Sequence, residues 1–378
     1  MNMRYEDEWA SNEDQLMREA GSLGELLMRL RGYFSTLPII GKQWKRLFEN
    51  AQSLPPTLAG FPLWMGFSVD KSQSTLLLDV SVLGGTHSAD YFRQHAKTGN
   101  GIPSTDCIAA LLDELDAPDS PLSDIAGNRV LVEYSIEPDR PEQGDCGYFL
   151  YPIGPTLAGD AAGQDLSELH VVYDVLSAVG GHAVDSARRR YADRVYLALG
   201  PGTRIGAMGA FVSSPQVFRV TMLGFRTPGE IMAYLDRTGW RGKKSLIISV
   251  LERLEERGVL SQMQLGVRLD FSDSGFEPTL EVQIFSANTI YDQTGWFKDK
   301  ECWIDLMNGL REEQIAVPEK LKGLTGWSAT MKTLMGCSGL LLLLQRIHHF
   351  AIVINGDGEL QVNAYLFLLT ARWPNSKN

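Results

Sequence analysis

The chain has 378 residues, a hydrophobic fraction of 44% and a formal net charge of −11 at pH 7. This hydrophobic content supports a substantial buried core and excludes an intrinsically disordered chain. Because a nucleic-acid backbone is bound by basic surfaces, the acidic balance argues against nucleic acid as a partner.

The sequence gives no targeting or membrane signal. The acidic N-terminus MNMRYEDEWASNEDQL has no apolar segment of the kind that signal peptides carry. The longest apolar run, GLLLLL at 339–344, is far shorter than the roughly 20 residues that span a bilayer. We therefore expect a cytoplasmic protein without a membrane partner.

The cysteines and histidines do not have the spacing of a metal site. The cysteines form no CxxC pair and no zinc-type cluster with histidine: Cys107, Cys146, Cys302 and Cys337. His348 and His349 are adjacent at the start of a predicted strand, where neighbouring side chains point to opposite faces. One ion could not use both rings, so we expect neither a metal nor a cofactor.

Two hairpins are predicted in the first part of the chain. After an N-terminal segment of helices over residues 1–60, the run FPLWMGFSVDKSQSTLLLDVSVLGG at 61–85 alternates on either side of a turn at 70–74. The helical stretch TDCIAALLDEL at 105–115 precedes a second alternating pair at 128–153. Period-2 alternation around a turn is typical of a β-hairpin with one apolar face.

The third unit is less regular. Helices at 166–179 and 185–192 precede predicted strands at 193–200 and 216–225. The glycine-rich stretch GPGTRIGAMGAF at 200–211 matches no phosphate-binding consensus and is interpreted as a loop between these strands.

Two further hairpins complete the series. The run QMQLGVRLDFSDSGFEPTLEVQIFSA at 262–287 alternates around a Ser-Asp-Ser-Gly turn. The run at 348–373 carries an Asn-Gly-Asp-Gly turn, a strong hairpin signal. Helices are predicted before them at 228–239, 245–258, 301–311 and 329–346.

Five units of helices followed by an antiparallel strand pair predict ten strands within residues 61–373 and no βαβ crossover. Successive hairpins tend to lie side by side, and a twisted ten-stranded sheet loses its exposed edges when it closes. The predicted fold class is therefore α+β, a single domain over residues 1–378 with one closed antiparallel ten-stranded barrel surrounded by helices. Apolar strand faces would pack against the helices, and polar faces would line a lumen. An α+β protein with two separate sheets is the alternative.

Several strands resemble those of the ABBA, or PT-barrel, aromatic prenyltransferases of the dimethylallyltryptophan synthase type. The similar runs are VEYSIEP (132–138), CGYFLYP (146–152), EPTLEVQIFSA (277–287) and FAIVINGDGELQVNAYL (350–366). The resemblance implies a PT-type barrel of five ααββ units. It also implies an allylic diphosphate held by inward lysines and arginines, with tyrosines that shield the allylic cation.

The chain departs from this family where the diphosphate would bind. Arg219 is retained, but three places of lysines are taken by Gly147, Thr221 and Glu281. Gln283 replaces a shielding tyrosine, whereas Tyr148 and Tyr365 remain in place. The resemblance therefore implies the fold more directly than the reaction.

Strand alternation alone, without the resemblance to a family, predicts which residues line the lumen. The inward polar residues would be Asp79, Ser81, Glu133, Ser135, Arg219, Thr221, Arg268, Asp270, Glu281, Gln283 and Asn363, four acids against two arginines. Uncompensated repulsion in a poorly solvated cavity costs several kcal/mol, so this lumen is unfavourable for a diphosphate. Aromatic walls are expected from Trp64, Tyr134, Phe149, Tyr196 and Phe367.

Three functions are compatible with these residues. In the first, the barrel serves natural-product biosynthesis and binds a small aromatic molecule or a peptide segment without an allylic diphosphate. The substrate-binding residues would be Asp79, Tyr148, Arg219, Arg268, Asp270, Gln283, Asn363 and Tyr365. In the second, an aromatic or peptide prenyltransferase holds dimethylallyl diphosphate with Arg219, Arg268 and Arg194. In the third, Glu133 and Glu281 are catalytic residues of a cyclase or isomerase.

For any one lumen residue the alternative is a closed network of side chains that satisfy one another without a ligand.

Overall fold

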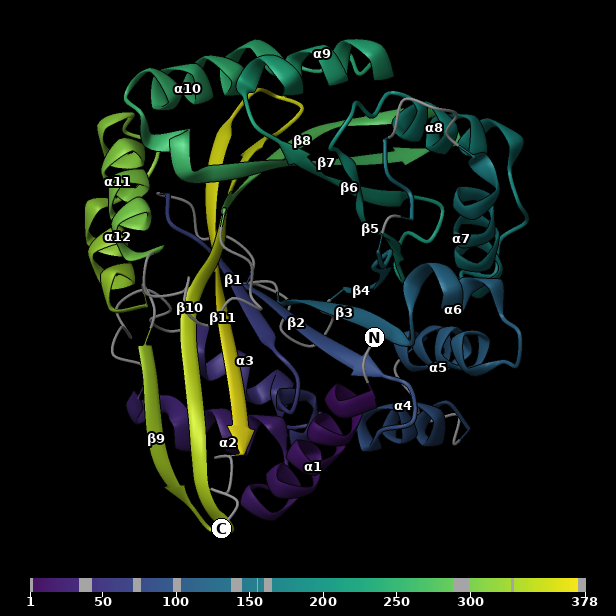
Figure 1. The fold of residues 1–378 in the computed structure, drawn as a ribbon, viewed down its shortest axis with the longest axis vertical. Coiled ribbons are helices and arrows are strands. Elements are labelled where there is room, and N and C mark those ends of the chain that lie inside the picture. The colour runs from purple at the N-terminus through teal and green to yellow at the C-terminus, as the bar shows by residue number, and fades with distance from the viewer. Residues whose placement is uncertain are drawn as a thin grey trace.

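Ten strands of the computed structural model close into an antiparallel barrel (Figure 1). They are β1 (Leu63–Ser68), β2 (Leu76–Leu83), β3 (Arg129–Ile136), β4 (Cys146–Leu150), β5 (Arg204–Phe211), β6 (Phe218–Phe225), β7 (Met263–Ser272), β8 (Gly275–Ser286), β10 (Gly339–Ile354) and β11 (Leu360–Arg372). The ring closes because β11 pairs with both β1 and β10. A further strand, β9 (Thr330–Gly336), lies outside the ring and pairs with the first half of β10. The predicted closed barrel is confirmed, and the alternative with two separate sheets is wrong.

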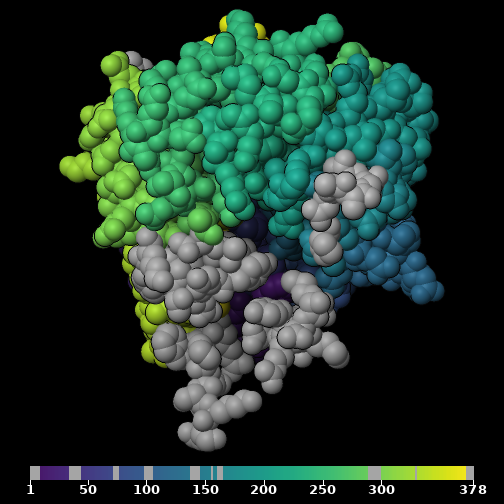
Figure 2. All heavy atoms as spheres, turned by 45° about the horizontal axis from the view of Figure 1, so that its top comes forward, coloured from purple at the N-terminus to yellow at the C-terminus, as the bar shows by residue number. Residues whose placement is uncertain are grey.

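Helices surround the barrel on its outer face (Figure 1). They are α1 (Met3–Glu19), α2 (Leu23–Leu30), α3 (Gln43–Ala51), α4 (His87–Lys97), α5 (Pro103–Asp116), α6 (Pro121–Ala126), α7 (Leu166–Val179), α8 (Ser186–Leu197), α9 (Pro228–Thr238), α10 (Lys244–Glu256), α11 (Asp299–Glu312) and α12 (Pro318–Leu324). Figure 2 shows one face of the molecule, with a hollow near its centre. None of the described helices combines the length and the apolar character needed to cross a membrane.

The structure describes residues 3–33, 43–70, 76–97, 103–136, 145–154, 156–159, 165–287, 299–327 and 330–372. Most of the predicted turn at 70–74, and the Pro/Gly-rich connection at 137–144, lie outside these ranges.

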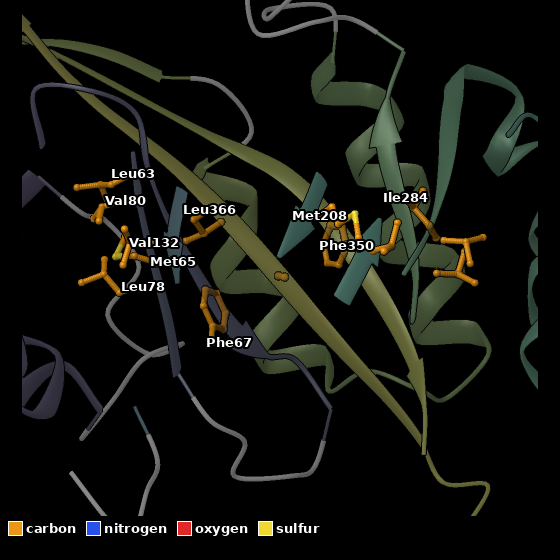
Figure 3. Packing of buried hydrophobic residues seen from close by; sticks show 14 of the residues in the cluster. Leu63, Met65, Phe67, Leu78, Val80, Val132, Met208, Ile284, Phe350 and Leu366 are labelled. Atoms are coloured by element: carbon orange, nitrogen blue, oxygen red, sulfur yellow. The ribbon is translucent and has the colours of Figure 1, made fainter. Parts of the chain in front are cut away.

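The two faces of the barrel strands carry different side chains. Met65 of β1 lies opposite Leu78 of β2 and Leu366 of β11, and all three are buried on the outer face against the helices (Figure 3). Trp64 and Asp79, which are opposite each other on the same two strands, point the other way. Because alternate residues of a strand lie on opposite faces, the sequence alternation divides an outer core from a lumen.

The prediction for the third hairpin was wrong in the position of its first strand. Residues 193–197 complete α8, whose first turn is capped by the Asp185 carboxylate, and the glycine-rich stretch read as a loop forms β5. Glycine is required there for packing, since a Cβ atom at Gly209 would collide with the Phe149 ring on β4. Sequence alternation missed β5 because glycine at positions 206 and 209 interrupts the period-2 pattern.

The helix predicted at 329–346 was also wrong, because these residues form β9 and the first half of β10. Leu341 and Leu343 are buried while Leu340 is exposed, so the leucine run alternates with period 2. The two-residue turn between the strands is held by Glu19 of α1, whose carboxylate accepts from the N–H groups of Cys337 and Ser338 at 2.7 and 2.8 Å. Tertiary contacts therefore override the helical preference of leucine.

Replacing Leu366 with alanine should lower the free energy of unfolding by about 2–5 kcal/mol, because a fully buried side chain is lost where β11 closes the ring. Denaturant titration followed by circular dichroism measures this change. Leu246→Ala on α10, where the side chain is 42% exposed, is the control and should cost under about 0.5 kcal/mol. Equal effects of the two substitutions would contradict tight packing at the closure.

Candidate functional site

A second apolar cluster lies inside the barrel, separate from the outer core. It contains Trp64, Leu131, Phe149, Phe211 and Phe367. The Phe149 and Phe211 rings meet edge to face with centroids 5.7 Å apart. Trp64, Leu131 and Phe149 line a cavity of about 330 Å³, which is large enough for a small aromatic group.

Arg219 anchors one half of a charged network in the lumen. Its Nε and Nη2 donate to the two carboxylate oxygens of Asp270 on β7 at 2.9 and 2.8 Å, and its Nη1 donates to Glu133 on β3 at 3.4 Å. The guanidinium also lies 4.5 Å above the Phe211 ring. Burial lowers the pKa of Arg219, but Asp270 and Glu133 outweigh burial and leave the pKa raised. The arginine is therefore charged and already paired.

Arg268 anchors the other half. Its Nη1 donates to Glu281 on β8 at 3.2 Å, and its Nε donates to the Thr221 hydroxyl at 3.4 Å. The Gln283 amide donates to the second Glu281 oxygen at 2.7 Å. Burial lowers the pKa of Arg268, but the neighbouring carboxylates, Glu281 above all, outweigh it and raise the pKa. This cation too is neutralised within the barrel.

Asp79 differs from the other lumen acids. It lies opposite Glu133 across the β2–β3 pair and is 7% exposed, yet its Oδ1 has no hydrogen-bond partner among the described residues. Burial, and next the charge of Glu133, raise the pKa of Asp79 well above its ordinary value. The folded lumen therefore holds the Asp79 proton to a higher pH than the unfolded chain does, at a residue that lines the cavity.

Because of a bulge in β10, two adjacent histidines both point into the lumen. The pairing with β11 shifts between Ile347 and His349, which leaves His348 as the extra residue. The His348 and His349 Nδ1 atoms lie 2.7 Å apart, and the His349 ring stacks on Tyr365 at 4.1 Å. The prediction that these neighbours point to opposite faces was wrong, because a bulge interrupts the alternation.

Both histidines are neutral. Burial, assisted by the charge of Arg346, lowers the pKa of His348 to about 3. Burial, with His348 and Arg268, also lowers the pKa of His349 well below its ordinary value. One ring therefore donates its Nδ1–H to the other. Within the described residues, no group of three or more histidine, cysteine, aspartate or glutamate side chains could hold a metal ion.

Three arginines that strand alternation did not predict as inward residues also line the cavity. Arg129 and Arg204 stand at the first residues of β3 and β5, and Arg346 precedes the bulge in β10. The Arg129 guanidinium lies 4.9 Å above the Tyr151 ring. Burial lowers the pKa of Arg346 to about 10 against the opposing charge of Asp299. The cavity is thus less acidic than the predicted inward residues implied.

Most predicted site residues do meet in one lumen. Asp79, Glu133, Arg268 and Gln283 line the cavity, and Arg219, Asp270 and Glu281 complete the network beside them. Tyr365 supports His349, and Asn363 lies on the same face of β11, opposite Ser68 of β1. Their roles in binding or catalysis stay predictions.

Tyr148 does not face the lumen. It lies opposite Val132 on β3, belongs to the outer core and places its hydroxyl beside Gly180 at the end of α7. Its neighbours on β4, Gly147 and Phe149, point inward instead. The sequence prediction misplaced Tyr148 because it assigned Gly147 and Tyr148, which are consecutive and so on opposite faces, to the same lumen.

Three further predicted lumen residues lie outside the barrel. Tyr134 packs against the outer core. Tyr196 is on α8, where its hydroxyl donates to the carbonyl oxygen of Ala158 at 3.4 Å. Arg194 is on the same helix, with its guanidinium 5.9 Å above the Tyr191 ring. The helical state of residues 193–197 explains the last two misplacements.

No protein-family model matches the sequence. A search of curated proteins gives no match either. Solved structures do match the barrel. A 6-dimethylallyltryptophan synthase from Micromonospora olivasterospora, in complex with DMASPP and Trp, is similar with a TM-score of 0.55 at 12% identity, over 92% of this chain and 97% of that one. AnaPT from Neosartorya fischeri is similar with a TM-score of 0.56 at 11% identity, over 94% of this chain and 93% of that one.

The chain has the PT-barrel fold. At these identities the likeness is one of fold, and the chemistry has to be argued from the lumen of this PT barrel. Gly147, Thr221 and Glu281 lie on its inward face, and none of them supplies a cation.

Stability should depend on pH through Asp79. Above about pH 4 the unfolded chain ionises this carboxyl group while the folded lumen keeps it protonated, so the native state binds more protons and loses stability as the pH rises. Asp79→Asn removes this loss. The variant should therefore gain stability relative to the wild type from about pH 4 upward, as measured by urea denaturation at a series of pH values.

Asp273→Asn is the matched control, because Asp273 is exposed in the β7–β8 turn. Its pH profile should follow that of the wild type. A profile of Asp79→Asn that also runs parallel to the wild type would contradict a raised pKa of Asp79 in the folded state.

Proposed function

We propose that this PT barrel binds an aromatic group with an N–H donor in its lumen, and that binding requires no allylic diphosphate. The observation that carries the proposal is Asp79, which lines the cavity and whose Oδ1 has no hydrogen-bond partner among the described residues. A buried polar atom without a partner costs free energy, which a ligand N–H would recover. The aromatic rings around it would hold a planar ligand in place.

The other lumen charges support a neutral or cationic ligand. Arg219 and Arg268 are held by Asp270 and Glu281, so a diphosphate between them would have to compete with these carboxylates. A cationic amine would instead be favoured by Glu133, which is 2% exposed and receives one weak donation from Arg219.

Asp79→Leu should weaken the binding of indole about tenfold, because the substitution keeps an apolar side chain of similar size and removes the acceptor, and one lost buried hydrogen bond costs roughly 1–3 kcal/mol. Isothermal titration calorimetry measures the change. The matched ligand is 1-methylindole, which has no N–H and should bind both proteins alike. Equal losses for the two ligands, or no binding of either to the wild type, would reject the proposal.

A second candidate function is transfer of a dimethylallyl group from its diphosphate to the bound aromatic ring. It is favoured by Arg129, Arg204 and Arg346 on the cavity wall, since neither Arg129 nor Arg204 forms an ion pair with a described carboxylate. In this reaction these cations would hold the diphosphate, and a lumen carboxylate would take the ring proton.

Incubation with dimethylallyl diphosphate and indole, tryptophan or tyrosine, followed by mass spectrometry, tests the second candidate. A prenylated product that Arg129→Gln and Arg346→Gln abolish, while indole binding persists, would establish it. The first proposal expects indole to bind and no such product to form.

For the third function, catalysis by lumen carboxylates, the geometry favours a different pair of residues from the predicted Glu133 and Glu281. Glu133 and Glu281 each have a separate arginine partner, whereas Asp79 is the cross-strand neighbour of Glu133. Asp79 and Glu133 are therefore the pair that could pass a proton to and from a bound ligand, as a cyclase or isomerase requires.

A further inference from the structure

The hairpin of β9 and β10 extends beyond the barrel as a fixed platform (Figure 1). Its turn is tied to α1 by the Glu19 carboxylate, which accepts from Cys337, from the Ser338 N–H and from the Ser338 hydroxyl. Lys332 of β9 donates to the carbonyl oxygen of Tyr33 at 2.5 Å. The hairpin is therefore held in place at its tip and along its length.

The outer edge of β9 offers unpaired backbone groups. Gly336 and Gly339 close the two-residue turn as a hydrogen-bonded pair, so alternate residues of β9 turn their N–H and C=O groups away from β10. These residues are Met331, Thr333 and Met335. Their outward groups make no hydrogen bond to the part of the chain that the structure describes. Such an edge is a template for one more strand.

Two of these residues, together with Leu340 of β10, form an exposed apolar stripe. Met335 is 80% exposed, Met331 is 53% exposed and Leu340, opposite Met335, is 40% exposed. The opposite face of the hairpin, with Leu341 and Leu343, is buried. Methionine adapts to many partners, which suits a surface that accepts side chains of varied shape.

The stripe continues into the lumen. Met331 lies opposite Leu344, and Leu344 lies opposite Leu369 of β11; both leucines pack against the aromatic cluster inside the barrel. Thr330, the first residue of β9, pairs with Gln345, the neighbour of the cavity-lining Arg346. A strand added to β9 that continued past Thr330 would therefore arrive at the cavity.

We propose that an extended peptide docks on β9 as an additional strand and places an aromatic side chain in the lumen. The inference rests on the proposed function and specifies its ligand as peptide. A free aromatic molecule has no main-chain groups to pair with the β9 edge, whereas a peptide pairs with it and sets every second side chain on the stripe.

The probe is an mRNA-displayed library of linear 12-residue peptides, each with one fixed tryptophan, selected on the full chain. Selected peptides are then titrated by fluorescence anisotropy against two variants. Thr333→Pro removes an outward N–H while leaving the bonds between β9 and β10, because proline is tolerated at the solvent side of an edge strand. We expect it to weaken binding about tenfold, since main-chain pairing is lost at the centre of the strand.

Thr333→Val is the matched control, because it keeps the N–H and the strand preference, and it should bind peptides as the wild type does. Circular dichroism confirms that both variants are folded. Equal affinities of the two variants, or a library that yields no binder, would overturn the proposal. A wild-type dimer that Thr333→Pro dissolves, seen by light scattering, would overturn it as well, because a second copy would then occupy the edge.

Ligand binding in the lumen and peptide docking on the β9 edge can be rejected independently of each other. Peptides that respond to Thr333→Pro but not to Asp79→Leu would support docking and reject the proposed lumen function. Indole binding that responds to Asp79→Leu, together with peptides that ignore Thr333→Pro, would reject docking alone.

Discussion

Charges inside the barrel must be paired, because each ion taken from water into the lumen costs several kcal/mol unless a partner replaces its hydration. This constraint organises the interior. Arg219 is opposite Asp270 and Arg268 is opposite Glu281 across neighbouring strands, so the two cations are neutralised by residues that the sheet places beside them. Asp79 forms no ion pair with a described residue, and burial raises its pKa instead. A ligand in the lumen therefore interacts with the polar groups that this charged network leaves unpaired.

The alternation of β7 and β8 was sufficient to predict the inward positions of Arg268, Asp270, Glu281 and Gln283, because a regular strand has a fixed period. It was not sufficient for β5, where glycine makes room for Phe149 and leaves little pattern to read. Nor could it locate the histidines, since a bulge is set by how β10 pairs with β11 and not by residue type. The pKa values of the site depend on burial and on neighbours from other strands, which no single segment specifies.

The fold is that of a PT barrel, but the residues in the lumen differ from those that the resemblance to aromatic prenyltransferases implies. Solved PT barrels match the architecture over more than nine-tenths of the chain. Inside it, Gly147 and Thr221 supply no charge, and the cations that line the cavity besides Arg268 come from strand ends and from the segment before the bulge. A shared scaffold can thus present a different set of groups, because lumen residues change without disturbing the apolar outer face that holds the barrel together.

The extra residue in β10 also determines what the outer hairpin can do. Arg346 and His349 both face inward although three positions separate them, and an uninterrupted pleat would set them on opposite sides. The bulge shifts the inward–outward alternation by one residue between the two halves of β10. Without it, Leu341 and Leu343, which are buried in the outer core, would lie on the inward face, and the methionine-rich side of the hairpin would lie on the outward face. One inserted residue thus aligns a surface outside the barrel with a chamber inside it.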